Sequence, residues 1–420
     1  MLPLTPHHRF LLGSLSLGHM VNDWVAGTIW LLAPAIAASM GLGPTEVGLI
    51  LTINGLGAAL AYIPAGIFAD RSTHPGYLML LSFWWVAIGY FSATLVSGFW
   101  AITLLLAFGV MGDAFWHPVA TGVLVKEMPK RRAQVLGIHA VGGGIGADVL
   151  GPLATGFLLG FFDWQTSLQI LVIPAFLMGI LFIPIATRIG ATAGNKISAI
   201  DLNGLVRHWL TGPGKLLILV MVLYNLSLIA ILSMTPLYLQ SEHGLTPFNA
   251  GLIFATMLLI GTIFQPFAGK YTDRRGRKPL IVITLIMSSL FATLAGLGSG
   301  LGWVVTGLLP AAALLTSIRP VVLAAAVDYS GKSEATTLGI VFTVLDGVGM
   351  LGALFAGLIG EFSLNYAFLL AAGFAMASAL ICMLLRFDFG TPSSFRPPSR
   401  NPVCPAWAKT CYLKGGNRKQ

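Results

Sequence analysis

The sequence predicts an all-α membrane protein with twelve transmembrane helices, arranged as two six-helix halves in parallel repeat around a central cavity. Three observations support this prediction. The composition suits a chain dissolved in lipid, the basic residues sort to one side of the predicted spans, and the two halves of the chain repeat one another.

The composition points to a bilayer as the solvent. Of 420 residues, 56% are apolar and only 9% are charged, whereas a soluble domain has roughly 25% charged residues. A membrane span needs about 20 apolar residues, so the length suffices for twelve spans, short loops and a tail. The 50 glycines favour close packing of helices in lipid. The net charge of +9 would suggest nucleic acid in a soluble protein, but here we expect no nucleic-acid partner.

Twelve apolar segments are separated by short polar stretches. The first is too long for a cleavable signal and is interpreted as a retained span. The predicted spans are residues 10–38, 46–68, 78–97, 99–125, 134–160, 165–187, 214–239, 247–269, 279–298, 303–327, 335–359 and 364–386.

The basic residues predict the orientation of these spans. Of the 24 Lys and Arg residues, only Arg319 lies in the interior of a span. The others lie in the termini, in loops after even-numbered spans or, for Lys215 and Arg386, within two residues of the end of a span that borders such a loop or terminus. Cytoplasmic loops carry the excess of Lys and Arg in membrane proteins. Both termini are therefore expected in the cytoplasm.

This orientation can be tested by labelling. Single cysteines introduced at Gly43 or Ser299 should react with an impermeant reagent added outside, because both positions fall in loops without Lys or Arg. Cysteines at Ser198 or Ser330 should react only after permeabilisation. The opposite pattern would reverse the orientation.

The two halves of the chain repeat with an offset of about 202 residues. AGIFADR at 65–71 matches AGKYTDR at 268–274, and LGPLATG at 150–156 matches LGALFAG at 351–357. His117 corresponds to Arg319, and Asn22 to Asn225. The predicted organisation is an N-terminal half at 1–187, a middle loop at 188–213, a C-terminal half at 214–386 and a basic tail at 387–420, which we expect to be disordered.

A duplicated loop motif follows spans 2 and 8. The second copy, GKYTDRRGRKP at 269–279, resembles the signature loop of the major facilitator superfamily, whose fold consists of two parallel six-span halves. The resemblance implies a latch on the cytoplasmic side, and topogenic charge is the alternative. Its residues are Gly66, Asp70 and Arg71 in the first copy, and Gly269, Asp273, Arg274, Gly276 and Arg277 in the second.

Two further resemblances narrow the function. GGGIGADVLGPLATG at 142–156 is similar to the glycine-proline motif that antiporters of this superfamily carry in span 5, with Gly151, Pro152 and Gly156 in the matching positions. Plain helix packing explains the same glycines. SLSLGHMVND at 14–23 and the Phe-Trp-His-Pro stretch at 115–118 resemble the fosmidomycin-resistance-like branch, which implies export of a drug or metabolite. In that branch Phe, His and Pro are contiguous, whereas here Trp116 intervenes.

Two carboxylate–imidazole pairs are predicted inside the membrane. His19 and Asp23 are four residues apart on span 1, and Asp113 and His117 repeat that spacing on span 4, so each pair shares a helix face. Spans 1, 4, 7 and 10 line the cavity in the superfamily that the chain resembles. An imidazole titrates near neutral pH, so both pairs are candidate proton-coupling residues; a satisfied polar pair that fixes helix packing is the alternative.

Other polar residues in the spans are candidates for substrate binding or gating. Arg319 keeps its charge and must be paired or hydrated; we expect it to bind either an anionic substrate or the Asp113 carboxylate. Asp148 and Asp346, in spans 5 and 11, are predicted at the interface between the halves. Asn22, Tyr224 and Asn225 could line the cavity or form ordinary interhelical hydrogen bonds. His139, near a helix start, is expected to be peripheral.

The sequence offers no support for cofactor, metal or enzyme chemistry. Cys404 and Cys411 lie in the tail with six residues between them and without a neighbouring histidine, which is not a metal-site pattern. No GxxxxGK[ST], HExxH or GxSxG motif is present in the sequence. We therefore expect neither cofactor nor metal, and no enzyme.

The leading hypothesis is a proton-coupled antiporter that exports a small organic compound or drug, an anion in particular. We expect a monomer in a bacterial inner membrane, with lipid, protons and a small-molecule substrate as partners. One alternative is a proton-coupled metabolite importer. Another is a transporter-like sensor or assembly protein that moves nothing, and a third is an integral membrane enzyme. The substrate is not readable from the sequence, because fold does not imply it.

Overall fold

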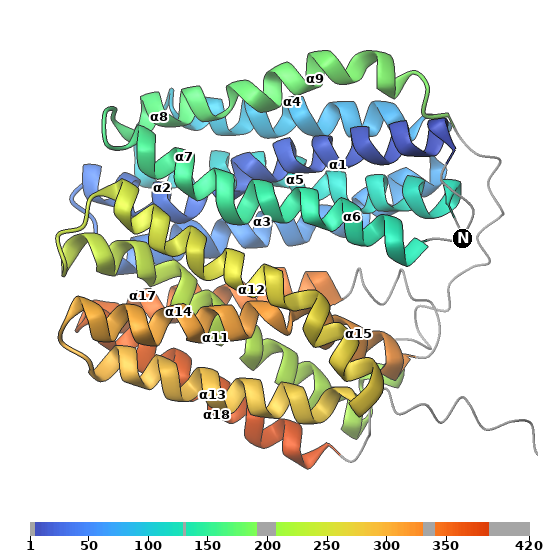
Figure 1. The fold of residues 1–420 in the computed structure, drawn as a ribbon. Helices are drawn as coiled ribbons and strands as arrows, with labels where there is room; N and C mark the ends of the chain where they lie inside the picture. Colours follow the sequence, from blue (N-terminus) through green and yellow to red (C-terminus); the bar gives the residue numbers. More distant parts are fainter. Residues whose placement is uncertain (1–4, 129–131, 191–206, 331–340, 386–420) are drawn as a thin grey trace, which may run out of the picture.

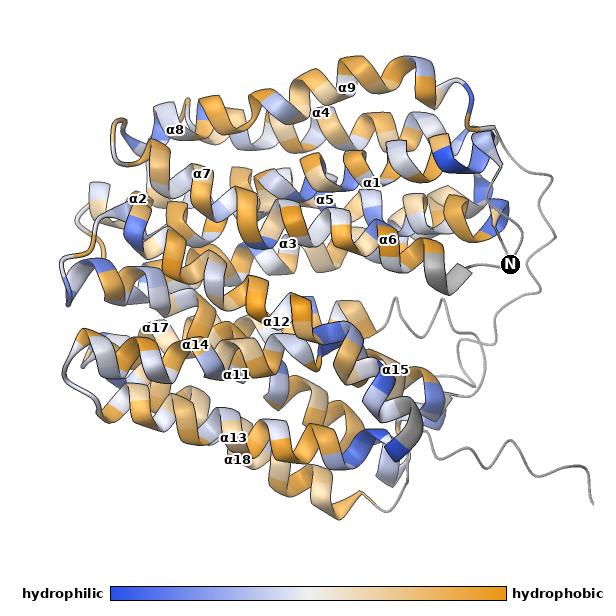
Figure 2. Ribbon diagram, viewed as in Figure 1, coloured by the Kyte–Doolittle hydropathy of each residue, from blue (hydrophilic) through white to orange (hydrophobic). Residues whose placement is uncertain are grey.

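A computed structural model describes residues 5–128, 132–190, 207–330 and 341–385. These residues form helices and no strand. Twelve helical stretches are long and apolar enough to cross a membrane, each overlapping one predicted span, so the predicted all-helical class is confirmed. Hydrophobic residues cover the helices along most of their length, while hydrophilic residues concentrate toward the ends (Figure 2).

The helices form two bundles that lie one above the other in Figure 1. The N-terminal half consists of α1 (Pro6–Gly27), α2 (Ile29–Ser39), α3 (Pro44–Arg71), α4 (Pro75–Ala93), α5 (Phe99–Glu127), α6 (Arg132–Gly144), η2 (Ile145–Leu150), α7 (Gly151–Leu158), α8 (Trp164–Leu171) and α9 (Ile173–Ala186). The C-terminal half consists of α11 (Gly212–Ser241), α12 (Pro247–Arg275), α13 (Arg277–Leu297), α14 (Leu301–Ser317), α15 (Arg319–Ser330), η3 (Val348–Met350), α17 (Leu351–Gly360) and α18 (Leu364–Leu384). Residues 341–346 continue span 11 before η3.

Local sequence signals explain where several helices begin. α3 starts with Pro44, whose fixed φ and missing N–H suit a first helical position, and the Glu46 carboxylate accepts the Gly43 backbone N–H at 3.0 Å. Gly276 separates α12 from α13 with a φ of +82°. Glycine adopts this left-handed region without steric cost, so the sharp turn inside the duplicated loop depends on it.

Five spans are irregular along their length. One of them, span 6, breaks at Val172 between α8 and α9. Span 1 breaks at Thr28, and span 10 breaks at Ile318, directly before Arg319. Span 5 contains the π-helical turn η2, and span 11 changes to the 3₁₀ turn η3 after Gly347. Such irregular turns free backbone groups and often mark functional positions. Arg319, Asp148 and Asp346 all lie at or next to one of these breaks.

The halves meet along two seams, α3 with α17 and α7 with α12. Close approach at both seams depends on glycine. A Cβ at Gly48 would overlap the Ala353 backbone, and one at Gly357 would overlap Pro44; at the other seam, a Cβ at Gly156 would lie 2.6 Å from the Pro247 carbonyl oxygen. Small residues are what allow membrane helices to pack backbone to backbone.

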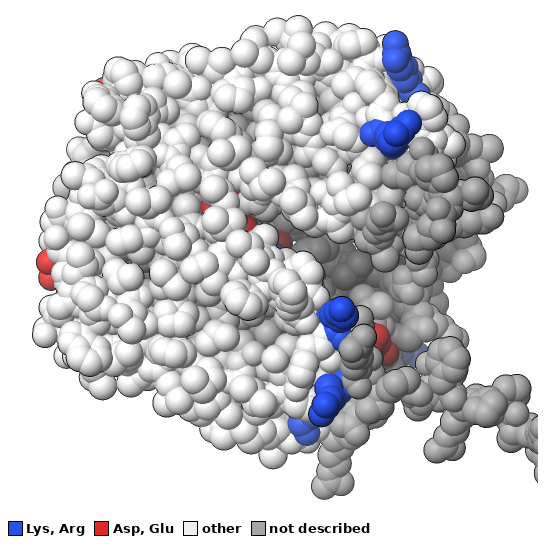
Figure 3. All heavy atoms as spheres, viewed as in Figure 1, with Lys and Arg blue, Asp and Glu red and all other residues white. Residues whose placement is uncertain are grey.

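Among the described residues, the contacts between the halves extend from one end of the molecule into its interior. A hollow separates them toward the other end, where Lys and Arg gather (Figure 3); we call this the basic end. A Cβ added at Gly66 of α3 or at Gly269 of α12 would have no neighbour within 4 Å. The structure is therefore closed at the end opposite the basic end and open at the basic end.

Enlarging Gly48 should shift this conformation. Gly48→Leu would overpack the α3–α17 seam, at a cost of roughly 1–3 kcal/mol, and favour the state in which that end is open. We expect a cysteine at Thr121, introduced into a chain without its native cysteines, to react more slowly from the basic end. Gly373→Leu is the matched control, because a Cβ at Gly373 of α18 meets no described atom within 4 Å and α18 packs within the C-terminal half. Unchanged reactivity in Gly48→Leu would contradict the role of this seam.

Candidate functional site

The first imidazole–carboxylate pair joins span 1 to span 5. His19 Nε2 lies 3.1 Å from Asp23 Oδ2 on α1, and His19 Nδ1 donates to the His139 carbonyl oxygen at 2.8 Å. A Cβ at Gly143 would overlap both side chains, so this glycine makes room for them. Because the Nδ1 proton is committed to a carbonyl, the contact of Nε2 with Asp23 is a hydrogen bond only when the pair holds a further proton, either on Nε2 or on the carboxyl group.

The second pair lies on α5. His117 Nε2 is 3.6 Å from Asp113 Oδ2, and Asp113 Oδ1 accepts the Asn22 side-chain amide at 2.6 Å. Asp113 and Asn22 are buried. Asn22 is therefore a direct partner of Asp113, which ties α1 to α5 at the site.

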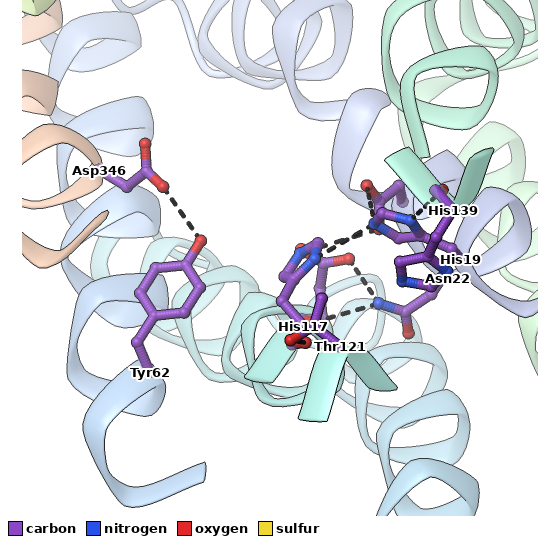
Figure 4. A network of polar contacts seen from close by, with 9 residues as sticks. His19, Asn22, Tyr62, His117, Thr121, His139 and Asp346 are labelled. Carbon is purple, nitrogen blue, oxygen red and sulfur yellow. Dashed lines mark hydrogen bonds and ion pairs between the residues drawn. The ribbon is translucent and has the colours of Figure 1, made fainter. Parts of the chain in front are cut away.

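The two pairs form one cluster of contacts. His19 Nε2 contacts His117 Nδ1 at 3.2 Å, and His117 Nε2 lies 3.9 Å from Asp23 Oδ1. The His117 side chain is 28% exposed, against 9% for His19, so His117 is the more accessible imidazole. Figure 4 shows the rings of His117, His19 and His139 in succession. We call His19, Asp23, Asp113 and His117 the imidazole–carboxylate cluster.

His139 is not peripheral, contrary to the expectation from sequence. Its ring is 1% exposed and stacks on His19 with centroids 4.1 Å apart. The run of glycines after it lets α6 approach α1 closely, which brings a residue near a helix start into the site. That run, Gly142 to Gly144, was the available signal.

The same atoms bear on metal binding. Donor atoms of His19, Asp23 and His117 all lie within 4.8 Å of one another, which is compatible with a metal ion. However, His19 Nε2 already lies at hydrogen-bonding distance from both partners, and a shared proton satisfies these contacts. Protons held between these groups can therefore satisfy the same contacts that a metal ion would satisfy.

Arg319 faces the seam from the C-terminal half. Its Nη2 donates to Asp346 Oδ1 at 2.8 Å, so Arg319 pairs with Asp346 and not with Asp113. The break at Ile318 directs the start of α15, and with it this side chain, toward span 11. The side chain stays 32% exposed, which leaves part of the guanidinium accessible to another anion.

Tyr62 connects the two charged groups across the seam, and sequence reasoning missed it. Its hydroxyl donates to Asp346 Oδ2 at 3.1 Å, while its ring lies 6.2 Å from the His117 ring and 6.0 Å from the Phe342 ring, centroid to centroid. Figure 4 shows Tyr62 between Asp346 and His117. Nothing in the local sequence distinguishes it from the other aromatic residues of the spans.

Tyr224 and Asn225 do not line the hollow. Both are fully buried, and they donate to the carbonyl oxygens of Leu315 at 2.9 Å and Leu345 at 2.6 Å. Their hydrogen bonds hold α11 against spans 10 and 11. The sequence left two interpretations open for these residues, substrate contact and ordinary interhelical hydrogen bonding. In this conformation they form interhelical hydrogen bonds and do not reach the hollow.

Of the residues predicted at helix interfaces, Asp346 lies on the first seam, and Asp148, Gly151, Pro152 and Gly156 lie on the second seam or next to it. Asp148 Oδ2, in the π-helical turn, accepts the Thr262 hydroxyl of α12 at 3.0 Å. A Cβ at Gly151 would lie 2.8 Å from the Trp24 carbonyl oxygen, and the Pro152 carbonyl lies against Gly251. Asp148 and Asp346 thus each accept a hydrogen bond from a hydroxyl of the opposite half, Asp148 on the second seam and Asp346 on the first.

The latch residues are only partly described. The side chains of Asp70, Asp273 and Arg274 lie outside the described part of the structure, although their backbones belong to α3 and α12. Arg71 is exposed at the end of α3. Arg277 Nε donates to Asp328 at 2.5 Å, joining α13 to α15 at the basic end.

Comparison with known proteins agrees with this architecture. The model of the Major Facilitator Superfamily matches residues 15–261 and 216–411, so the chain belongs to that family. The fosmidomycin resistance protein of Escherichia coli (strain K12) is 24% identical, covering 84% of this chain and 86% of the relative. The hexuronate transporter of Bacillus subtilis (strain 168) is 25% identical, covering 93% of this chain and 97% of the relative.

Solved structures share the fold at low identity. A bacterial homolog of the human lysosomal transporter Spinster, in an inward-facing and occupied conformation, has a TM-score of 0.75 at 17% identity, covering 92% of this chain and 98% of the other. The nucleoside transporter NupG has a TM-score of 0.74 at 15% identity, covering 89% and 98%. The chain is thus a multi-pass membrane protein with a secondary-transporter fold.

Proposed function

We propose that this chain is a proton-coupled antiporter that exports a small organic anion. One observation carries the proposal: Arg319, in the middle of a span, is 32% exposed and pairs with Asp346, which also accepts the hydroxyl of Tyr62, a neighbour of His117. An arginine in the membrane is costly unless it serves a purpose, and its planar fork suits carboxylate or phosphonate groups.

The names of two relatives support an anionic substrate class. Fosmidomycin carries a phosphonate and a hexuronate carries a carboxylate, and both groups can bind a guanidinium in bidentate fashion. The proton-coupling role is assigned to Asp113, His117, Asp23 and His19. His117 is the most exposed member, and it is the natural point at which the cluster exchanges protons with water in the hollow.

The proposed orientation places the basic end and both termini in the cytoplasm of a bacterial cell, so that this conformation opens inward. It rests on the positive-inside rule. The duplicated Asp-Arg loops would then latch the cytoplasmic side when the hollow closes, with Gly66 and Gly269 as contact points that are free here. We propose that a single chain performs the cycle as a monomer.

Proteoliposomes with an internal pH dye test the function. Vesicles loaded with fosmidomycin or glucuronate and placed in acidic medium should release the anion and acidify faster than protein-free vesicles. Release without proton entry would remove the coupling. No flux of either anion in either direction would favour the alternative of a non-transporting sensor.

Import is the second candidate, because the hexuronate transporter aligns with 93% of this chain. The same proteoliposomes distinguish import from export. Anion accumulation with protons moving in the same direction indicates symport, whereas opposite movement indicates antiport. The glycine-proline motif in span 5 favours antiport through its resemblance to the motif of the antiporters.

A further inference from the structure

Among the described residues, the last hydrogen bond across the α3 seam lies between the two charged sites. Going along α3, Thr45 N donates to Glu361 at 3.0 Å, Thr52 Oγ1 donates to the Met350 carbonyl at 2.8 Å, and Tyr62 Oη donates to Asp346 at 3.1 Å. One turn further, Gly66 meets nothing within 4 Å. Tyr62 therefore lies at the boundary between the closed seam and the hollow.

Asp346 is a shared acceptor at this boundary. Its Oδ1 binds Arg319 within the C-terminal half, and its Oδ2 binds Tyr62 from the N-terminal half. The charged and titratable groups that surround Tyr62 are Asp346, Arg319, His117 and Asp113. Any change in the Arg319–Asp346 pair must alter the hydrogen bond that Tyr62 makes, because one carboxylate serves both donors.

We propose that Tyr62 is a positioning residue. Its hydroxyl couples the binding of an anion at Arg319 to the protonation of the imidazole–carboxylate cluster. This inference rests on the proposed function. An anion that binds Arg319 competes with Asp346 for the guanidinium. Among the described residues, Tyr62 is then the donor that remains to Asp346. Because the carboxylate has lost its counterion, the hydrogen bond that Tyr62 donates to it becomes stronger.

Movement of Tyr62 toward Asp346 changes the surroundings of His117. The Tyr62 ring lies against His117 on one side and Phe342 on the other, so the ring cannot follow its hydroxyl without changing its contact with His117. By linkage, the protonation of the cluster must in turn alter the affinity at Arg319 by the same factor. The hydroxyl contributes to this coupling through the direct contacts of Tyr62 with Asp346 and His117. Electrostatic attraction between the charged groups adds to it.

Tyr62→Phe isolates the hydroxyl, since it keeps the ring and its contacts with His117 and Phe342. The measurement is the dissociation constant of fosmidomycin and of glucuronate for purified full-length protein at pH 6 and pH 8. In the wild type we expect the two values to differ by about fivefold or more, the low end of typical allosteric coupling. In Tyr62→Phe the ratio for glucuronate, whose carboxylate stays ionised over this pH range, should fall toward 1 while binding persists.

Tyr90→Phe is the matched control. It also removes a buried hydroxyl, one that accepts the Asn54 side-chain amide at 3.3 Å within the N-terminal half. Its binding ratio should equal that of the wild type. A double-mutant cycle with Asp346→Ala adds a second measurement, because Tyr62→Phe should change nothing further once the shared acceptor is gone.

The outcomes separate this inference from the proposed function. A wild-type ratio that survives in Tyr62→Phe means that the coupling acts through space, and the role of the hydroxyl is wrong. Additive effects in the cycle would equally overturn the route through Asp346. A wild-type affinity that does not change with pH removes the proton coupling itself, and this inference with it.

Discussion

Asp113→Asn is expected to abolish anion transport driven by a pH gradient while leaving anion exchange intact. The amide is similar in shape to the carboxylate, and its oxygen can still accept the hydrogen bond that Asn22 donates at 2.6 Å. It cannot take up a proton, so the cluster loses one of its two carboxylates. Proton-driven flux in proteoliposomes should fall to the background of protein-free vesicles.

Exchange is the decisive companion measurement. Vesicles loaded with unlabelled fosmidomycin should still take up labelled fosmidomycin through Asp113→Asn, because exchange requires the anion site and the conformational cycle but no net proton movement. Asp163→Asn is the control, since Asp163 caps the start of α8 outside the site. Full proton-driven transport by Asp113→Asn would contradict the proton-coupling role of Asp113.

Arg319→Ala is expected to weaken binding of both test anions by about 10- to 150-fold. This range corresponds to the roughly 1.5–3 kcal/mol of a hydrogen bond to a charged group. Arg319→Lys should recover only part of the affinity, because an ammonium lacks the planar fork that binds a carboxylate or phosphonate in bidentate fashion. Equilibrium binding to purified protein is the measurement.

Loss of Arg319 also leaves Asp346 without its charge partner, which is destabilising in a low-dielectric site. The double variant Arg319→Ala with Asp346→Asn removes that unpaired charge, and it should bind the anions as weakly as the single variant. Lys278→Ala is a control cation, since Lys278 donates to the Met383 and Leu385 carbonyls at the basic end. Unchanged anion affinity in both Arg319 variants would remove the anion-site role.

The conformational boundary gives these two predictions a common physical basis. Arg319 and the imidazole–carboxylate cluster belong to different halves, and Tyr62 lies between them at the end of a glycine-lined seam. Anion binding at Arg319 can therefore change the contacts of Tyr62 at the seam, and these contacts include His117 of the cluster. In such an arrangement the coupling free energy is reciprocal, which is why pH-dependent binding is as informative as flux.

The sequence alone determined the class, the number of spans and the identity of most charged residues in the site. These features depend on local properties. Hydropathy is summed over about 20 residues, and the spacing of four that joins His19 to Asp23 and Asp113 to His117 follows from helix geometry. Arg319 was identifiable because a charge within a span is costly wherever the helix lies.

The tertiary structure decided which of these residues meet. The pairing of Arg319 with Asp346 depends on the break at Ile318, the position of His139 depends on how closely α6 approaches α1, and the burial of Tyr224 and Asn225 depends on the rotation of α11. Sequence spacing fixes which residues share a face of one helix. It leaves open which neighbouring helix that face meets, because helix rotation and depth are set by packing between helices.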